Sequence, residues 1–112
     1  MRARTSITKL KHFLLLLLMV LFLPVMSAMA DTEATYKSKC AGCHGADGAA
    51  STPVAKTLGV RDFHSPDVQR ETDQELGDII SKGKNKMPKY ADKLKDSEIK
   101  DLVGYVRMLS KK

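Results

Sequence analysis

The chain has 112 residues and carries 19 basic against 13 acidic residues, a formal net charge of +6. This length allows one domain at most. Four of the basic residues precede position 31, so residues 31–112 hold 15 basic and 13 acidic residues, a net charge of +2. The excess of positive charge therefore does not indicate nucleic-acid binding, which needs a basic surface on the folded domain.

The first 30 residues have the pattern of an export signal. The start is basic, with Arg2, Arg4, Lys9 and Lys11. An unbroken apolar run follows from Phe13 to Leu23, and Pro24 is expected to end any helix there. Ala28-Met29-Ala30 is the small-x-small pattern that signal peptidase accepts. We predict a cleaved signal peptide over residues 1–30 and a mature domain over 31–112, exported to the bacterial periplasm.

Residues 13–30 have an alternative interpretation as an uncleaved anchor, because the segment is nearly long enough to span a bilayer. The domain would then be tethered to the membrane; with cleavage it would have no membrane contact.

Residues 31–112 are poor in side chains that fill a core. They contain no Trp, three Tyr and one Phe. A domain of about 80 residues usually needs disulfides, a metal or a cofactor to be stable. A disulfide between Cys40 and Cys43 would enclose almost no loop and stabilise little. We therefore expect a bound group to supply the missing bulk.

Helical signals dominate the first part of this domain. Asp31 to Lys39 predicts a short helix, and the Gly-, Ala- and Ser-rich segment from Gly45 to Pro53 predicts a loop. Ser65-Pro66 predicts a cap with proline at the first helical position, opening a turn or two through Arg70.

The next helix is predicted to begin at a capping box, Thr72 to Glu75. Leu76, Ile79 and Ile80 form its apolar stripe, and Gly83 offers a left-handed stop. A basic loop from Lys84 to Leu94 follows.

The last helix has the clearest pattern, with Asp96 as its expected cap. One face is apolar, formed by Ile99, Leu102, Val103, Val106 and Leu109. Since almost nothing alternates with period two, we predict an all-α fold of three to four helices. We expect connections this long to wrap around a bound group.

The run from Cys40 to His44 carries the chemistry. Two thiols three residues apart on a turn of helix project to one side, where each can form a thioether to a vinyl group of the same haem. His44 follows at once, so its imidazole can reach the iron. This spacing predicts one covalently attached haem c.

Two other sites use similar residues. A thioredoxin-like dithiol requires a βαβ fold, for which no strands are predicted. A structural zinc site needs four ligands, and residues 31–112 offer only Cys40, Cys43, His44 and His64. Adjacent Cys and His ligands are unusual for tetrahedral zinc, so haem is the favoured interpretation.

A second axial ligand must come from later in the chain. Met108 lies off the apolar face of the last helix, and His64 lies in a loop beside Phe63. Met87 lies in the basic loop with Pro88 behind it, where a methionine has no core role unless it points inward. We favour Met87, with His64 as the alternative. Two axial ligands leave the iron no open position, so we predict an electron carrier rather than an enzyme.

Residues 36–109 resemble the class I c-type cytochromes, the small proteins of bacterial respiratory and photosynthetic chains. The matching motifs are Tyr36 before the first Cys, Cys40 to Gly45, Asp47-Gly48, the methionine loop over 82–90, and the C-terminal helix over 101–107. The resemblance implies a cytochrome c-like fold with His44 and Met87 as axial ligands, and we expect a monomer.

The resemblance also implies contacts around the haem. A proline carbonyl orients the ligand histidine in the family, and Pro53 is the candidate. The terminal helices cross near one haem edge in the family. The position of the glycine often found at this crossing is occupied by Thr32 here, so the crossing is expected to be looser or to rely on Gly104. The usual cap of the last helix falls at Lys95, which cannot cap, so Asp96 is expected to take over.

Six lysines fall within fourteen residues around Met87 and could ring the exposed haem edge. They are Lys82, Lys84, Lys86, Lys89, Lys93 and Lys95. They would steer encounters with an acidic patch on a redox partner, or they form an ordinary solvated loop. The predicted function is a periplasmic one-electron shuttle of a respiratory or photosynthetic chain. The alternative is a membrane-tethered haem c module or a subunit of a larger oxidoreductase complex.

Overall fold

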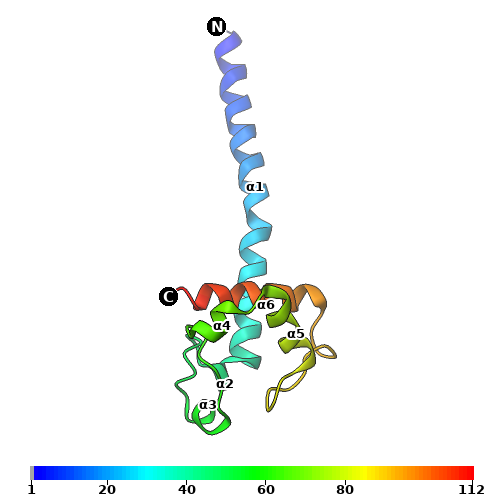
Figure 1. Cartoon of the computed structure of the whole chain (residues 1–112). Helices are drawn as coiled ribbons and strands as arrows, with labels where there is room; N and C mark the ends of the chain where they lie inside the picture. The colour runs from blue at the N-terminus through cyan, green and yellow to red at the C-terminus, as the bar shows by residue number, and fades with distance from the viewer. Residues whose placement is uncertain (1) are drawn as a thin grey trace. The chain divides into compact units, whose positions relative to one another are not determined.

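The computed structural model describes residues 2–112, and their side chains except those of residues 2–5 and 22–26. Its helices run in the order α1 (Arg2–Lys39), α2 (Ala41–His44), α3 (Pro53–Leu58), α4 (Pro66–Arg70), α5 (Asp73–Lys82) and α6 (Asp96–Leu109), as Figure 1 shows. The chain divides into two units, Met1–Asp31 and Thr32–Lys112.

The first unit is the helical segment that carries the predicted leader. Met1 lies outside the described residues, and the side chains of Arg2, Arg4 and Pro24 are likewise not described. Every side chain from position 6 to 21 is exposed. The break expected at position 24 was wrong, because α1 continues through it. A proline removes one hydrogen bond and strains one turn, and helical turns on both sides can outweigh that cost.

None of the helices formed by the described residues combines the length and the apolar character that a bilayer span requires.

The second unit confirms the all-α prediction: no strand forms within the described residues, apart from one isolated bridge between Lys84 and Met87. It has more helices than expected, because α2 and α3 are very short. The helix α3 was missed by the sequence analysis. Thr52 caps it by accepting the Ala55 amide at 3.0 Å, and Pro53 takes the first helical position.

The helix starts at α4 and α5 follow the sequence rules. Ser65 caps α4, accepting the Val68 amide at 3.5 Å. At α5 the capping box is complete: the Thr72 hydroxyl accepts the Glu75 amide at 3.2 Å, and the Glu75 carboxylate accepts the Thr72 amide at 2.6 Å.

The cap predicted for α6 was wrong. Asp96 is the first helical residue and Lys95 is the N-cap, without a side-chain cap hydrogen bond. Glu98 replaces the missing interaction, because its carboxylate accepts the Lys95 amide at 2.8 Å. An acid three residues into the helix can therefore set the start without a capping side chain.

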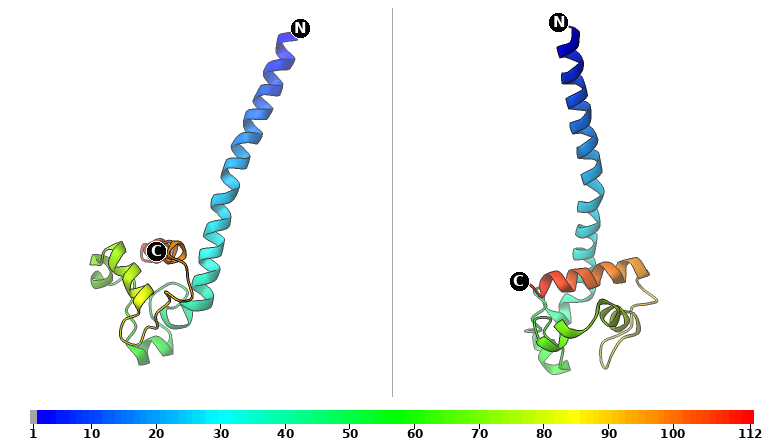
Figure 2. Two further views of the ribbon diagram at one scale, coloured as in Figure 1. Left: turned by 90° about the vertical axis from the view of Figure 1, so that its right-hand side faces the viewer. Right: turned by 45° about the horizontal axis from the view of Figure 1, so that its top comes forward.

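The core lies where α6 crosses the part of α1 that belongs to the second unit (Figures 1 and 2). Five residues of one α6 face are buried, as its apolar stripe predicted. The crossing is made by Tyr36 and Tyr105, whose ring centroids lie 5.0 Å apart. It does not rely on Gly104, since a Cβ there would meet no atom of the described chain within 4 Å. Bulky rings thus separate two helices that glycine lets approach closely in the family.

A matched pair of valines tests this core. Val103 on α6 is 5% exposed and Val54 on α3 is 46% exposed. We expect Val103→Ala to lower the free energy of unfolding by about 2 kcal/mol, because it leaves a cavity beside α5. Val54→Ala should change it by less than about 0.5 kcal/mol. Urea denaturation of the haem-loaded protein followed by circular dichroism measures both; equal losses would contradict the core as described.

Candidate functional site

The Cys40–His44 motif forms a tight helical turn directly after α1. The Cys40 amide donates to the Tyr36 carbonyl at 2.9 Å, and the Cys40 carbonyl accepts the His44 amide at 2.9 Å. Cys40 and Cys43 are half-buried, carry free thiols in the described structure, and line the same cavity. Burial raises the pKa of the Cys40 thiol, so the thiol is neutral at pH 7.

The His44 imidazole lines this cavity and lies against an aromatic ring. The Phe63 ring is stacked on it, with centroids 4.8 Å apart and planes at 29°. Burial, aided by the nearby Arg61 guanidinium, lowers the pKa of His44 below its ordinary value. The imidazole is therefore neutral at pH 7, which is the form that binds a metal.

The hydrogen bond expected from His44 to the Pro53 carbonyl is not formed in this structure. His44 Nδ1 is buried and finds no hydrogen-bond partner within the described part of the chain. The Pro53 carbonyl accepts the Thr57 hydroxyl at 3.1 Å instead. This follows from α3, whose first residue is Pro53: a carbonyl in the first turn of a helix accepts from within the helix.

Tyr36 stabilises the end of the motif through a buried hydrogen bond. Its side chain is 1% exposed, and its hydroxyl donates to the Gly45 carbonyl at 2.7 Å. Burial is the main cause that raises the pKa of this phenol far above its ordinary value. The hydroxyl is therefore a permanent donor, and it ties the end of α2 to α1.

Met87 reaches the cavity on a turn that follows α5. Lys84 and Met87 exchange two backbone hydrogen bonds, at 2.9 and 3.3 Å, around Asn85, whose φ is +54°. Gly83 is needed at the start of the turn: with φ +77° and ψ 166° it lies outside the left-handed helical stop that was predicted, and a Cβ would be 2.6 Å from the Met87 carbonyl.

The far end of this loop is held by the last turn of α5. The Tyr90 amide donates to the Ile80 carbonyl at 3.0 Å, and the Ala91 amide donates to the Ser81 carbonyl at 3.1 Å. These carbonyls are among those that a helix end leaves without an intrahelical donor. The loop that carries Met87 is thus fixed at both ends by backbone contacts.

These residues surround one cavity of about 370 Å³, which brings together Cys40, Cys43, His44 and Met87. The rest of its wall is largely apolar, including Leu58, Val60, Leu76, Ile79, Leu102 and Val106. Arg61 and Lys84, which also line it, are cations that suit the carboxylate side chains of a haem. The unpartnered imidazole, paired thiols, thioether and apolar wall fit a haem c. The sequence analysis missed Arg61 and Phe63, which no local motif marks.

The other candidate ligands lie outside this wall. The His64 ring lies 2.6 Å from an Asp62 carboxylate oxygen and is not part of the lining. Met108 is half-buried on α6, also outside the lining. In the described residues no three His, Cys, Asp or Glu side chains converge as a metal site would require.

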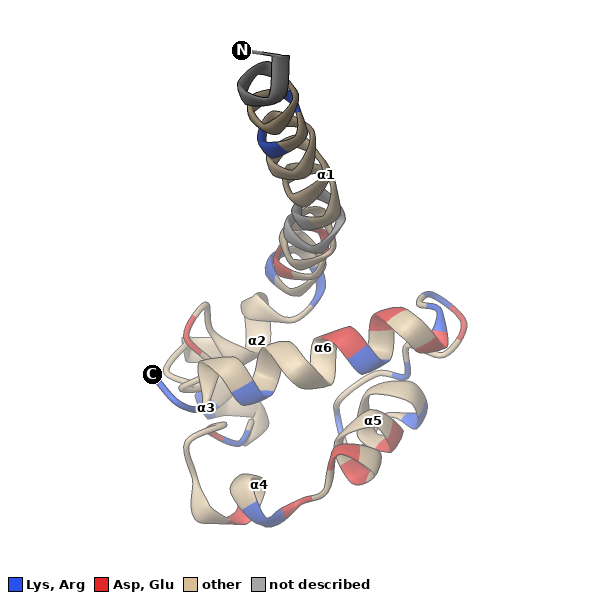
Figure 3. Cartoon of the chain, turned by 90° about the horizontal axis from the view of Figure 1, so that it is seen from above, with Lys and Arg blue, Asp and Glu red and all other residues tan. Residues whose placement is uncertain are grey.

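The six predicted docking lysines are partly paired with acidic residues. Lys82 lies 3.4 Å from Asp78, Lys84 lies 3.9 Å from Glu71, and Lys89 lies 3.0 Å from Asp92. The Lys93 amine lies 5.6 Å from the centre of the Tyr90 ring. Figure 3 shows acidic and basic segments intermixed over α5 and the first half of α6. Among the six, Lys86, Lys93 and Lys95 make no ion pair within the described structure.

Comparison with known proteins agrees with these features. Residues 27–106 match the family model of subunit III of cbb3-type cytochrome c oxidase. A solved structure, the KustC0563 c-type cytochrome, is 32% identical, with a TM-score of 0.64; the match covers 69% of this chain and 94% of that chain. The search of curated proteins gave no match. A domain of this kind carries covalently bound haem c with its iron.

Two tyrosines provide a test of how the motif is supported. Tyr36→Phe should lower the free energy of unfolding by about 1–3 kcal/mol, because the Gly45 carbonyl loses its donor in a buried place. The control is Tyr90→Phe, which removes a solvent-exposed hydrogen bond from the Tyr90 hydroxyl to the Lys39 carbonyl at 3.1 Å. Water can replace that bond, so the loss should stay below about 0.5 kcal/mol. Urea titration compares the two; a larger loss for Tyr90→Phe would refute this account.

Proposed function

This chain belongs to the family of subunit III of cbb3-type cytochrome c oxidase, and on that premise we propose that it carries single electrons between protein partners on one haem c. The observation that supports this is the convergence of two thiols, an imidazole and a thioether on one largely apolar cavity. The haem iron supplies the redox change between its ferric and ferrous states.

Each protein group has a separate task in this proposal. Cys40 and Cys43 would hold the haem through thioethers, and neutral His44 would bind its iron. Met87 would be the second protein ligand of the iron, and a thioether ligand favours the ferrous state and raises the reduction potential. Two protein ligands would leave the iron no open position, so the proposed role is that of a carrier and not an enzyme.

The two methionines of the second unit test the proposed ligation. Met87→Ala should abolish the weak far-red absorption band of the ferric protein, lower its reduction potential, and let the ferrous protein bind carbon monoxide at once. Met108→Ala is the control, since Met108 lies outside the cavity wall. Optical spectra of both variants in both oxidation states provide the measurement. A Met87→Ala protein with the wild-type band would exclude Met87 as a ligand, and His64→Ala would then be examined.

We further propose that the protein acts as a free periplasmic shuttle after its leader is removed. The solved c-type cytochrome that it resembles is covered over 94% of its length, so a single domain of this size accounts for nearly all of that chain. The boundary between the two units, after Asp31, lies one residue from the proposed cleavage after Ala30. The mass of the exported protein should correspond to a chain that begins at Asp31 and carries one haem; a full-length mass would indicate a tethered module.

The second candidate function is a subunit of an oxidase complex, which the name of the matching family supports. Purification after mild detergent extraction separates the two. A shuttle should be recovered alone in the periplasmic fraction, whereas a subunit should be recovered with membrane proteins.

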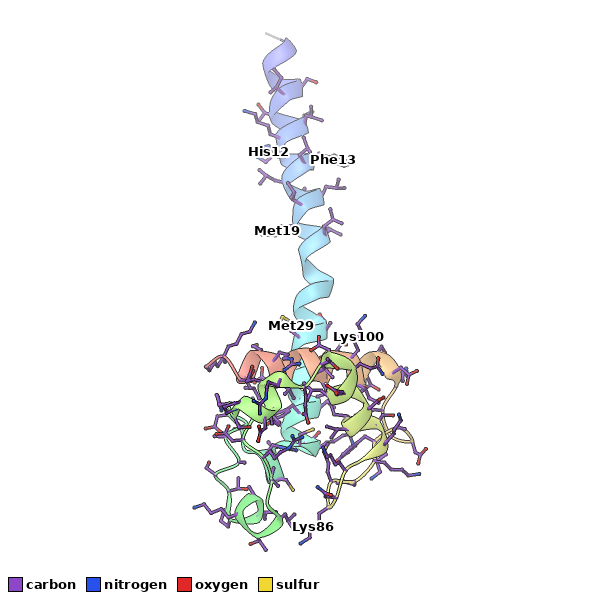
Figure 4. All side chains as sticks on the ribbon, in the orientation of Figure 1. His12, Phe13, Met19, Met29, Lys86 and Lys100 are labelled. Atoms are coloured by element: carbon purple, nitrogen blue, oxygen red, sulfur yellow. The ribbon has the colours of Figure 1, made fainter. Side chains whose placement is uncertain are left out.

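Docking to partners is proposed to depend on the lysines that are free of ion pairs near the cavity. Lys86 lies on the turn that carries Met87 and lines the cavity, whereas Lys100 lies on α6, at a distance from that turn (Figure 4). Lys86→Gln should slow electron transfer to a partner with an acidic patch and weaken its salt dependence, because one attractive charge is lost.

The control for this experiment is Lys100→Gln, which removes the same charge from α6. Stopped-flow rates at several ionic strengths give the comparison, since salt screens attraction between exposed charges. Rates that do not vary with salt, or equal effects of both substitutions, would refute docking through this turn.

A further inference from the structure

Phe63 occupies a position between the haem-attachment motif and the core. Its ring is 8% exposed, stacks on His44 at 4.8 Å, and meets the Tyr36 ring edge-on at 6.5 Å. Phe63 is the one phenylalanine of the second unit, and no motif in the sequence marks it. Its flat face is thus placed against the imidazole that the proposed function assigns to the iron.

The backbone on both sides of Phe63 holds this ring in place. The Phe63 amide donates to the Gly48 carbonyl at 2.9 Å, and the Phe63 carbonyl accepts the Gln69 side-chain amide at 2.8 Å. Gly48 lies so close that a Cβ there would be 2.3 Å from Phe63 Cδ2. Gly48 therefore provides the space that lets the ring reach His44, which gives a physical reason for the glycine of the Asp47-Gly48 pair.

The second nitrogen of the His44 ring makes no hydrogen bond within the described residues. A metal-binding histidine usually donates its second ring N–H to an acceptor, and that bond fixes the ring. His44 Nδ1 is buried without such an acceptor among the described residues, and the Pro53 carbonyl accepts the Thr57 hydroxyl at 3.1 Å. Within the described structure, the aromatic ring that contacts the His44 imidazole is that of Phe63.

We propose that Phe63 is the positioning residue of His44: its ring sets the plane of the imidazole by stacking and keeps water away from it. The inference rests on the proposed function, because it takes His44 as an iron ligand. Aromatic rings prefer offset or edge-on contacts over an exact face-to-face sandwich.

The experiment uses the haem-loaded protein in the ferric state. Electron paramagnetic resonance is suited to it, because the g values of low-spin haem depend on the orientation of the axial ligand planes. Phe63→Leu keeps an apolar side chain of similar bulk but removes the flat face. We expect shifted and broadened g values, and a lower reduction potential because water reaches the imidazole. Phe63→Tyr keeps the flat face and should retain the wild-type g values.

The matched control is Leu94→Ala, at a residue that is 7% exposed and lies outside the cavity wall. It should lower the midpoint of urea unfolding while leaving g values and potential as in the wild type. Gly48→Ala should shift the g values as Phe63→Leu does, because it displaces the ring without removing it. If Phe63→Leu does not accumulate with haem, Phe63→Met replaces it, since methionine fills the space without a flat face.

Wild-type g values in Phe63→Leu or Phe63→Met would overturn the inference, and so would an equal shift in Leu94→Ala. A wild-type protein without a low-spin ferric signal would contradict the proposed function itself. The two failures are therefore distinguishable.

Discussion

The structure depends on a cavity that lies where a larger domain would have the middle of its core. The second unit has a buried apolar cluster of ten described residues, and six of these also line the cavity: Tyr36, Phe63, Val68, Leu76, Leu102 and Val106. Burial of apolar surface is the main driving force of folding, and small domains have little of it. A haem in this place would complete the core and carry the function, so stability and redox chemistry would share one set of side chains.

This constraint explains which parts of the molecule could be predicted from the sequence. The starts of α4 and α5 are set by neighbours in the chain, Ser65 with Pro66 and Thr72 with Glu75, so local rules predicted them. The same rules apply to Thr52-Pro53, and α3 was missed because the Gly- and Ala-rich segment before it dominated the interpretation. Asp96 was a plausible cap, and only the contact between Glu98 and the Lys95 amide shows why the helix begins at Asp96 instead.

The residues of the functional site also fall into those that a local motif predicts and those that only the fold brings together. The Cys40–His44 motif spans five residues, and its spacing predicts the chemistry. The contacts that surround it come from distant parts of the chain: Phe63 lies 19 residues after His44, and Met87 lies 43 residues after it. Neither Phe63 nor Arg61 belongs to a local pattern, so only the fold brings them to the cavity. The local pattern also did not show that Pro53 begins a helix, in which its carbonyl accepts the Thr57 hydroxyl.

The two sides of the cavity are built differently. On the His44 side, short backbone bonds, the Tyr36 hydroxyl bond and the Phe63 stack join α1, α2 and the loop before α4. On the Met87 side, a turn with exposed residues is held by backbone bonds at its ends, and Gly83 has a backbone conformation that other residues avoid. Regions with few buried apolar contacts open most easily. Any exchange of the proposed ligands would therefore begin at Met87, while His44 and the attached haem stay in place.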